Sequence, residues 1–315
     1  MTLAVVLTAS FCGCRREEGA EAQYLVIFHA GSLSVPLREV SVEFMEANPH
    51  ITVRAEAAGS RTCARKISDL SKQCDVMASA DYTVVENLLI PDHANFNIRF
   101  ATNEMAIAYT QESKHADKIT SKNWTDILLA DGVRFGRADP NHDPCGYRSV
   151  MAMKLAEKKL NRPGLAAEML NKRDQIMRPK ETDLLSHLQL GEIDYLFIYR
   201  SVAKQHKLKI LLLSDEVNLK SPELADLYKT VTVKVTGKEK DQFITKTGGA
   251  MVYSVTIPKN APNRPAAEAY VAFLLSDKGK AIVEANGQPS PRPAVTDGFE
   301  HLPESLKPFC VENKK

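Results

Sequence analysis

The chain has 315 residues, 44% of them hydrophobic and 25% charged, a composition typical of folded globular proteins rather than of disordered or fibrous ones. Its 41 basic and 39 acidic residues leave a formal net charge of +2, so the composition argues against a protein built to coat nucleic acid. The length exceeds the usual size of one compact domain and predicts two lobes around two cores.

The first residues resemble an export signal. Apolar and small residues fill the stretch 2–13, which is too short to span a bilayer, and charged residues follow Cys14 directly. This boundary is similar to the lipobox of bacterial lipoproteins, so we expect a signal peptide over 1–14, lipidation of Cys14 and a linker over 15–23. A plain secretory peptide cleaved near Ala20 is the alternative. Both interpretations place the mature protein outside the cytoplasm, in the periplasm or on the outer face of a membrane.

Strands and helices alternate through the first third of the chain. A β-rich run over 24–28 leads into a helix after Ser34, a strand over 51–55 leads into a helix over 63–70, and a buried strand follows at 75–78. Such alternation predicts a largely parallel sheet with helices on both faces. Ligand sites in such sheets lie beyond the carboxyl ends of the strands.

The same alternation continues to the end of the chain. Further strands are predicted at 105–109, 133–136, 195–199, 211–213 and 251–257. Further helices are predicted at 124–129, 184–188, 266–275 and 279–284, with another opened by the turn-rich loop 138–149. The fold class predicted is therefore α/β.

Four cysteines lie beyond the signal region, at positions 63, 74, 145 and 310. None of them is spaced as C-x-x-C, so the sequence does not predict a zinc cluster. One or two disulfides and free buried thiols both remain open.

Two Gly-Ser turns follow predicted strands. Ser32 and Ser60 each stand where a strand gives way to a helix, so their hydroxyls and the free N–H groups of the helix could meet one anion. The alternative is that both serines merely cap their own helices.

Five segments, in order, resemble the tungstate/molybdate-binding proteins of ABC importers. They are HAGSL (29–33), AAGS (57–60), DPCGYRS (143–149), RPKETDL (178–184) and YRSVAKQH (199–206). The resemblance runs from about Tyr24 to near Pro293. It implies a two-lobed periplasmic-binding-protein fold, in which each lobe is a mixed sheet flanked by helices and the ligand lies in the cleft.

The resemblance also implies that the chain crosses twice between the lobes. Lobe 1 is then expected at 24–108 plus 250–315, and lobe 2 at 109–249. The expected hinge segments are 106–110 and 253–256.

The resemblance assigns four residues to the oxygens of the anion. The hydroxyls of Ser32 and Ser60 would bind from one lobe. The backbone N–H of Cys145 and the hydroxyl of Tyr199 would bind from the other. The thiol of Cys145 need not take part.

Asp143 and Glu181 are expected to reach the metal centre of the oxyanion. A carboxylate that faces a bound dianion repels it, so the presence of two such groups needs a reason. In the family that the chain resembles, residues at these positions coordinate tungsten or molybdenum, and hard carboxylate oxygens suit such a centre. An Asx turn at Asp143 and a favourable place for Glu181 in a first helical turn are the alternatives.

The function implied by the resemblance is capture of tungstate or molybdate and delivery to the permease of an ABC transporter. We expect a monomer, anchored to the membrane through Cys14, that has no cofactor, does not bind nucleic acid and is not an enzyme. One alternative is a binding protein for another anion, or for a metal cation held by His29, His142 and the two carboxylates. A cysteine-dependent hydrolase using Cys145 is a further alternative, although partners so near in sequence seldom meet face to face.

Overall fold

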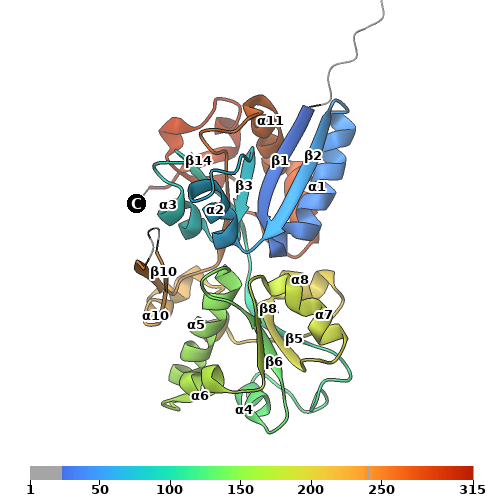
Figure 1. The fold of residues 1–315 in the computed structure, drawn as a ribbon, viewed down its shortest axis with the longest axis vertical. Coiled ribbons are helices and arrows are strands. Elements are labelled where there is room, and N and C mark those ends of the chain that lie inside the picture. The colour runs from blue at the N-terminus through green and yellow to red at the C-terminus, as the bar shows by residue number, and fades with distance from the viewer. Residues whose placement is uncertain (1–22, 238, 240, 315) are drawn as a thin grey trace, which may run out of the picture.

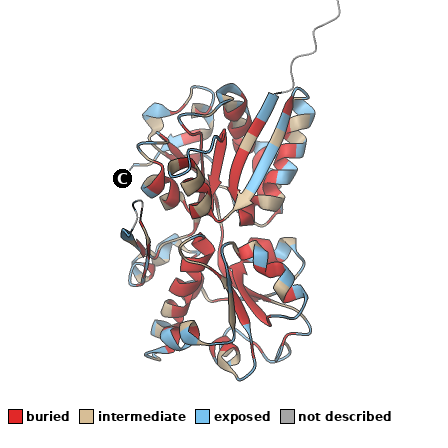
Figure 2. Ribbon diagram, viewed as in Figure 1, coloured by how far each residue is buried: buried red, intermediate tan, exposed pale blue. Residues whose placement is uncertain are grey.

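The computed structural model describes residues 23–237, 239 and 241–314, and the predicted signal peptide with Cys14 lies outside them. The described part forms two lobes that lie one above the other along the long axis (Figure 1). Each lobe is built on its own sheet, and buried residues concentrate in the two sheets and on the inner sides of their helices (Figure 2). In the described part of the chain, no helix has the length and apolar character needed to cross a membrane.

The first lobe contains a seven-stranded mixed sheet. Its strands, in spatial order, are β14 (Cys310–Glu312), β13 (Ala294–Asp297), β4 (Asn97–Thr102), β12 (Val252–Thr256), β3 (Val76–Ser79), β1 (Gln23–Ala30) and β2 (Ile51–Ala58). β1 is parallel to both β2 and β3, whereas β12 is antiparallel to β3 and β4. The carboxyl ends of β1, β2 and β3 therefore meet at one edge of the sheet.

Helices cover both faces of this sheet because successive side chains of a strand point to opposite faces. Leu25 and Ile27 of β1 join the core beneath α1, whereas Phe28 joins the core beneath α2 and α3. The helices and 3₁₀ turns of this lobe are η1 (Gly31–Leu33), α1 (Ser34–Ala47), α2 (Ser60–Ser68), α3 (Tyr82–Leu88), α11 (Arg264–Leu275), α12 (Asp277–Ala285), η4 (Phe299–His301) and η5 (Lys307–Phe309). Phe44 of α1 packs edge-on against Tyr270 of α11, with ring centroids 5.1 Å apart.

The second lobe contains a five-stranded mixed sheet. Its strands, in spatial order, are β7 (Gln175–Arg178), β6 (Phe135–Ala138), β8 (Tyr195–Tyr199), β5 (Met105–Tyr109) and β9 (Lys209–Leu212). Its helices are α4 (Trp124–Leu129), α5 (Pro144–Lys159), α6 (Leu165–Asn171), η2 (Glu181–Asp183), α7 (Leu184–Gln189), α8 (Arg200–Gln205) and α9 (Asp215–Asn218).

A separate hairpin lies beside the junction of the lobes. It pairs β10 (Thr232–Thr236) with β11 (Phe243–Thr247), after η3 (Pro222–Leu224) and α10 (Ala225–Tyr228). The hairpin is at the left of Figure 1, next to α5 of the second lobe and below α3 of the first.

The chain passes between the two sheets twice. It leaves β4 at Thr102 and enters β5 at Met105, so Asn103 and Glu104 form the first crossing. The return from the second sheet begins after β9, at Leu212, and passes through the hairpin, and 248–251 are its last residues before β12. The expected boundary at 108 lies inside β5, the expected hinge at 106–110 covers most of β5, and the expected hinge at 253–256 lies inside β12. Because β5 pairs with β8 over its whole length and with β9 over 106–109, this strand belongs to the second sheet.

Candidate functional site

The carboxyl edge of the first sheet carries Ser32 and Ser60. β1 and β2 run parallel and in register to their ends, so the two turns that follow lie side by side. Both serines are buried. The N–H of Ala80, just after β3, donates to Ser60 Oγ at 2.9 Å, and the hydroxyl of Tyr253 donates to Ser32 Oγ at 3.0 Å.

The second lobe closes against this edge. A Cβ atom placed on Gly59 would lie 2.3 Å from the carbonyl oxygen of His142, so the approach is possible only without a side chain. The same oxygen accepts the N–H groups of Arg61 and Thr62 at 3.2 and 3.3 Å. Contacts between backbone groups of the two lobes therefore border the site.

Asp143 caps helix α5. Its Oδ1 accepts the N–H of Cys145 at 2.8 Å, and its Oδ2 accepts the N–H of Glu181 at 3.2 Å. The Asx-type turn considered for Asp143 is therefore present, because Pro144 starts the helix and Asp143 satisfies an N–H of its first turn. The N–H of Cys145, expected to meet the ligand, donates to Asp143 in this structure.

Glu181 is the residue with the most unusual surroundings. It begins η2, is 1% exposed, and neither of its carboxylate oxygens has a hydrogen-bond partner among the residues that the structure describes. Burial, with the charge of Asp143 adding to it, raises the pKa of Glu181 well above its usual range. A buried polar group without a partner costs free energy, so this carboxyl points to a partner other than the polypeptide.

Tyr199 ends β8, and Arg148 fixes its hydroxyl. The Nη1 atom of Arg148 donates to the hydroxyl oxygen of Tyr199 at 3.0 Å and to the carbonyl of Ala80, in the first lobe, at 2.7 Å. Burial raises the pKa of Tyr199 well above its usual range, so its hydroxyl keeps its proton. The matched segments also carry the basic residues Arg148, Arg178 and Lys180. Arg148 is buried beside the site, whereas Arg178 is exposed and the ammonium of Lys180 pairs with Asp183 at 3.0 Å.

A chain of contacts joins the predicted residues. Ser60 connects through Ala80 and Arg148 to Tyr199, whose ring is 6.0 Å from that of Tyr253, and Tyr253 donates to Ser32. Asp143 joins Cys145 and Glu181 to each other as described above. The two groups approach each other where Gly59 lies against His142 and where a Cβ on Gly31 would lie 2.8 Å from Thr182 Oγ1, so the six residues lie along one junction between the lobes.

Sequence reasoning did not find Tyr253 or Asn103. Tyr253 lies in the central strand β12 and is fully buried, and Asn103 lies in the first crossing. The available signal for Tyr253 was a tyrosine within an apolar strand, whose buried hydroxyl needs a partner.

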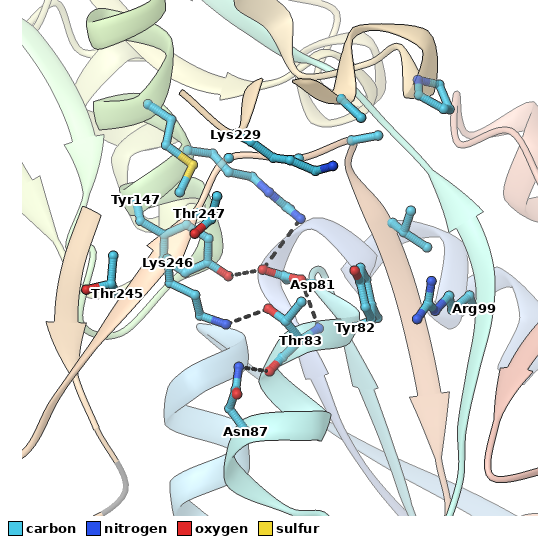
Figure 3. Close-up of a pocket in the computed structure, with 18 residues that line it drawn as sticks. Asp81, Tyr82, Thr83, Asn87, Arg99, Tyr147, Lys229, Thr245, Lys246 and Thr247 are labelled. Atoms are coloured by element: carbon cyan, nitrogen blue, oxygen red, sulfur yellow. Dashed lines mark hydrogen bonds and ion pairs between the residues drawn. The ribbon is translucent and has the colours of Figure 1, made fainter. Parts of the chain in front are cut away.

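A cavity of about 610 Å³ lies beside the site, between α3, α5 and the hairpin. Figure 3 shows Asp81 at its centre, between Tyr147 and Thr83. Asp81 accepts the hydroxyl of Tyr147, and Lys246 donates to Thr83. None of the six predicted residues lines this cavity.

The geometry gives no support to a metal-cation site at His29 and His142 or to a cysteine-dependent hydrolase. Among the described residues, no three His, Cys, Asp or Glu side chains are placed to hold a metal ion. His29 Nδ1 lies 2.8 Å from the carbonyl oxygen of Ala30, and His142 Nδ1 lies 3.3 Å from the hydroxyl of Thr62. Burial raises the pKa of the Cys145 thiol well above its usual range, which opposes a nucleophilic role. The four cysteines within the described ranges are free thiols.

Comparison with known proteins gives consistent matches. The model of the bacterial extracellular solute-binding protein family matches residues 25–288. An uncharacterized solute-binding protein of Petrotoga mobilis is 48% identical over 286 residues, covering 90% of this chain and 89% of that protein. The molybdate/tungstate-binding protein WtpA of Pyrococcus abyssi is 40% identical over 337 residues, covering 97% and 96%. The solved periplasmic molybdate-binding protein of Azotobacter vinelandii shares the fold, with a TM-score of 0.62 at 17% identity, over 85% of this chain and 100% of that one.

Proposed function

The chain belongs to the bacterial extracellular solute-binding protein family, and on that basis we propose that it captures molybdate or tungstate for an ABC transporter. The named relatives at 40% identity support this ligand, since they match this chain over nearly their whole length. The protein binds its anion outside the cytoplasm and passes it to the membrane permease. It is not an enzyme and leaves the anion chemically unchanged.

The observation that carries the proposal is the unpartnered carboxyl of Glu181. Its two oxygens are buried, and we assign them to one site with the hydroxyls of Ser32, Ser60 and Tyr199, because Gly31, next to Ser32, approaches Thr182, next to Glu181. If sulfate were bound, the carboxylate of Glu181 would face only the negatively charged oxygens of that anion and would repel them. Hexavalent tungsten and molybdenum accept further hard oxygen ligands, so the carboxylates of Glu181 and Asp143 complete their coordination.

The remaining predicted residues bind the oxygens of the anion. Ser32, Ser60 and Tyr199 donate their hydroxyl protons, and the N–H of Cys145 is shared between Asp143 and the anion. Arg148 supplies a buried positive charge from just behind Tyr199 without contacting the ligand.

The two crossings between the sheets act as the hinge. Ligand groups come from both lobes, and contacts such as that between Gly59 and His142 border the site only when the lobes are together. We assign the hinge to Asn103–Glu104 and to 248–251, and the lobes to the residues on either side of these segments. Opening at the hinge separates the serine hydroxyls from the carboxylates.

We also propose that the mature chain is held at the membrane by a lipid on Cys14. The apolar stretch before this cysteine and the charged residues after it support the proposal. The protein acts as a monomer beside its permease.

Calorimetric titration of the ligand-free protein tests the proposed ligand. Tungstate and molybdate should bind stoichiometrically, and sulfate and phosphate should bind far more weakly. Equal binding of sulfate would contradict the assignment of the carboxylates to a metal centre. Binding of neither metal oxyanion would contradict the proposed function itself.

A further inference from the structure

The three hydroxyls of the site all have their oxygens occupied by hydrogen-bond donors. The N–H of Ala80 donates to Ser60 Oγ, and the guanidinium of Arg148 donates to the hydroxyl of Tyr199. A backbone N–H and a guanidinium can only donate. The protons of Ser60 and Tyr199 must therefore point away from these partners.

The direction of the Ser32 hydroxyl proton is set by a longer chain of hydrogen bonds, called the relay below, which runs from Asn103 through Tyr253 to Ser32. The Oδ1 atom of Asn103 accepts the N–H of Glu104 at 3.0 Å, which fixes the orientation of the amide. Its Nδ2 atom therefore faces Ser201 Oγ at 2.7 Å and the hydroxyl oxygen of Tyr253 at 2.9 Å. All of these side chains are buried, so water does not replace either contact.

Tyr253 passes this direction on to Ser32. Because its oxygen accepts from Asn103, its own proton points to Ser32 Oγ at 3.0 Å. Burial raises the pKa of the Tyr253 hydroxyl, so that proton stays in place. The hydroxyl proton of Ser32 is then left to point into the site.

We propose that Asn103 is a positioning residue which, through Tyr253, fixes the hydroxyl of Ser32 as a donor to the bound oxyanion. This inference rests on the proposed function, since it assumes an anion beside Ser32. With all three hydroxyls fixed as donors, the site favours anions whose oxygens carry no proton. The proton of a protonated anion oxygen would face the proton of a site hydroxyl instead of an acceptor, so one hydrogen bond would be lost.

The place of Asn103 in the fold gives the relay a second consequence. Asn103 lies in the first crossing, Tyr253 lies in the sheet of the first lobe, and Ser201 lies in α8 of the second. One amide group therefore contacts both lobes at the hinge. The direction of the Ser32 hydroxyl is set by the same residue around which the lobes turn.

The substitution Asn103→Asp reverses the relay at constant shape. The introduced carboxylate oxygen would accept the proton of Tyr253, Tyr253 would accept from Ser32, and the lone pairs of Ser32 would face the anion. Tungstate should bind at least about tenfold more weakly in calorimetric titration, because a hydrogen bond to a charged group is lost.

The double variant Asn103→Asp with Tyr253→Phe separates the relay from the added charge. Without the tyrosine hydroxyl, the reversed hydrogen-bond direction cannot pass from residue 103 to Ser32. The double variant should therefore bind tungstate at least about threefold more tightly than Asn103→Asp alone. Tyr253→Phe by itself should weaken binding less than Asn103→Asp does, since Ser32 loses its fixed direction but can still turn toward the anion. If Asn103 and Tyr253 served only in packing, the losses of tungstate affinity in the two single variants would instead add in the double variant.

Two results would overturn the relay while the wild type binds tungstate. One is unchanged binding by Asn103→Asp, and the other is equal weakness of the single and double variants. A wild-type chain that binds neither tungstate nor molybdate overturns the proposed function and the relay together. If thermal melting shows that Asn103→Asp does not fold, Asn103→Leu is tested in its place. Asn103→Leu is then compared in the wild-type and the Tyr253→Phe background, and an equal loss of tungstate affinity in both would overturn the relay.

Discussion

Replacement of Glu181 by glutamine should weaken ligand binding and strengthen the ligand-free fold. The buried carboxyl of Glu181 has no hydrogen-bond partner in the described part of the chain and lies beside the Asp143 carboxylate, whose charge adds to the rise in its pKa. Glutamine keeps the shape, and its amide can donate to Asp143. Relief of one unpaired buried group is worth about 1–3 kcal/mol, which corresponds to a rise in Tm of at least about 2 °C.

Binding should change in the opposite direction. If Glu181 completes the coordination of the metal centre, its loss costs more than an ordinary hydrogen bond, above about 1.5 kcal/mol or roughly tenfold in affinity for tungstate. Titration calorimetry measures the affinity, and thermal melting of the ligand-free protein measures the stability. The matched control is Glu304→Gln, because the side chain of Glu304 is 87% exposed and both quantities should stay unchanged.

The opposite outcome would refute this reasoning. If the carboxylate only borders the anion, glutamine relieves repulsion, tungstate binds more tightly and sulfate gains entry. X-ray absorption at the tungsten edge gives an independent test on the wild-type complex. Four short oxygen neighbours with no longer ones would contradict coordination by Glu181 and Asp143, even if the affinity fell as expected.

The remaining predictions concern closure, acid stability and anchoring. Gly59→Ala should weaken tungstate binding at least about tenfold and keep the radius of gyration large in scattering with ligand, because its Cβ would lie 2.3 Å from the carbonyl oxygen of His142. Burial alone would raise the pKa of Asp81, but the charges around it, that of Arg148 foremost, lower it to about 2. Because the unfolded value is about 3.9, the charge of Asp81 stabilises the fold above that pH, and this stability should be lost as pH falls through about 2. Mass spectrometry of protein from its native membrane should show a diacylated Cys14.

Each of these predictions has a control or a contrary result. Glu304→Gln is again the control for closure, because its side chain is 87% exposed and lies outside both the site and the proposed hinge. If Asp81→Asn loses as much stability as the wild type between about pH 4 and pH 2, another group is responsible. A soluble mature chain that begins near Glu21 would contradict the lipid anchor.

The fold could be predicted from the sequence because its strongest patterns are local. The apolar run at 24–28 lies within β1, and the Gly-Ser turns that follow β1 and β2 stand at the predicted edge of the sheet. The family resemblance is confirmed by the match over residues 25–288. The strands β4, β7, β10, β11, β13 and β14 were not predicted. β7, β10 and β11 are partly exposed, whereas β4 is mostly buried and interrupted by polar residues.

The pairing of strands could not be predicted from single runs. Residues 105–109 were predicted as a strand, yet the run does not show which sheet it joins, and the structure pairs it with β8 and β9. The orientation of hydroxyl groups was likewise hidden. Asn103 and Tyr253 are 150 positions apart in the chain, and only the fold brings their side chains into contact.

Selectivity and closure depend on the same contacts in this structure. Arg148 fixes Tyr199 in the second lobe while it donates to Ala80 in the first, and Ala80 in turn fixes Ser60. In the opening that we propose at the hinge, the contact between Arg148 and Ala80 would break and the serines would move away from Glu181. The complete set of donors and carboxylates therefore exists only in the closed form, which makes closure favourable when an anion that uses all of them is bound. The same dependence would allow release, because a permease that held the lobes apart would remove the proposed site without competing for the anion.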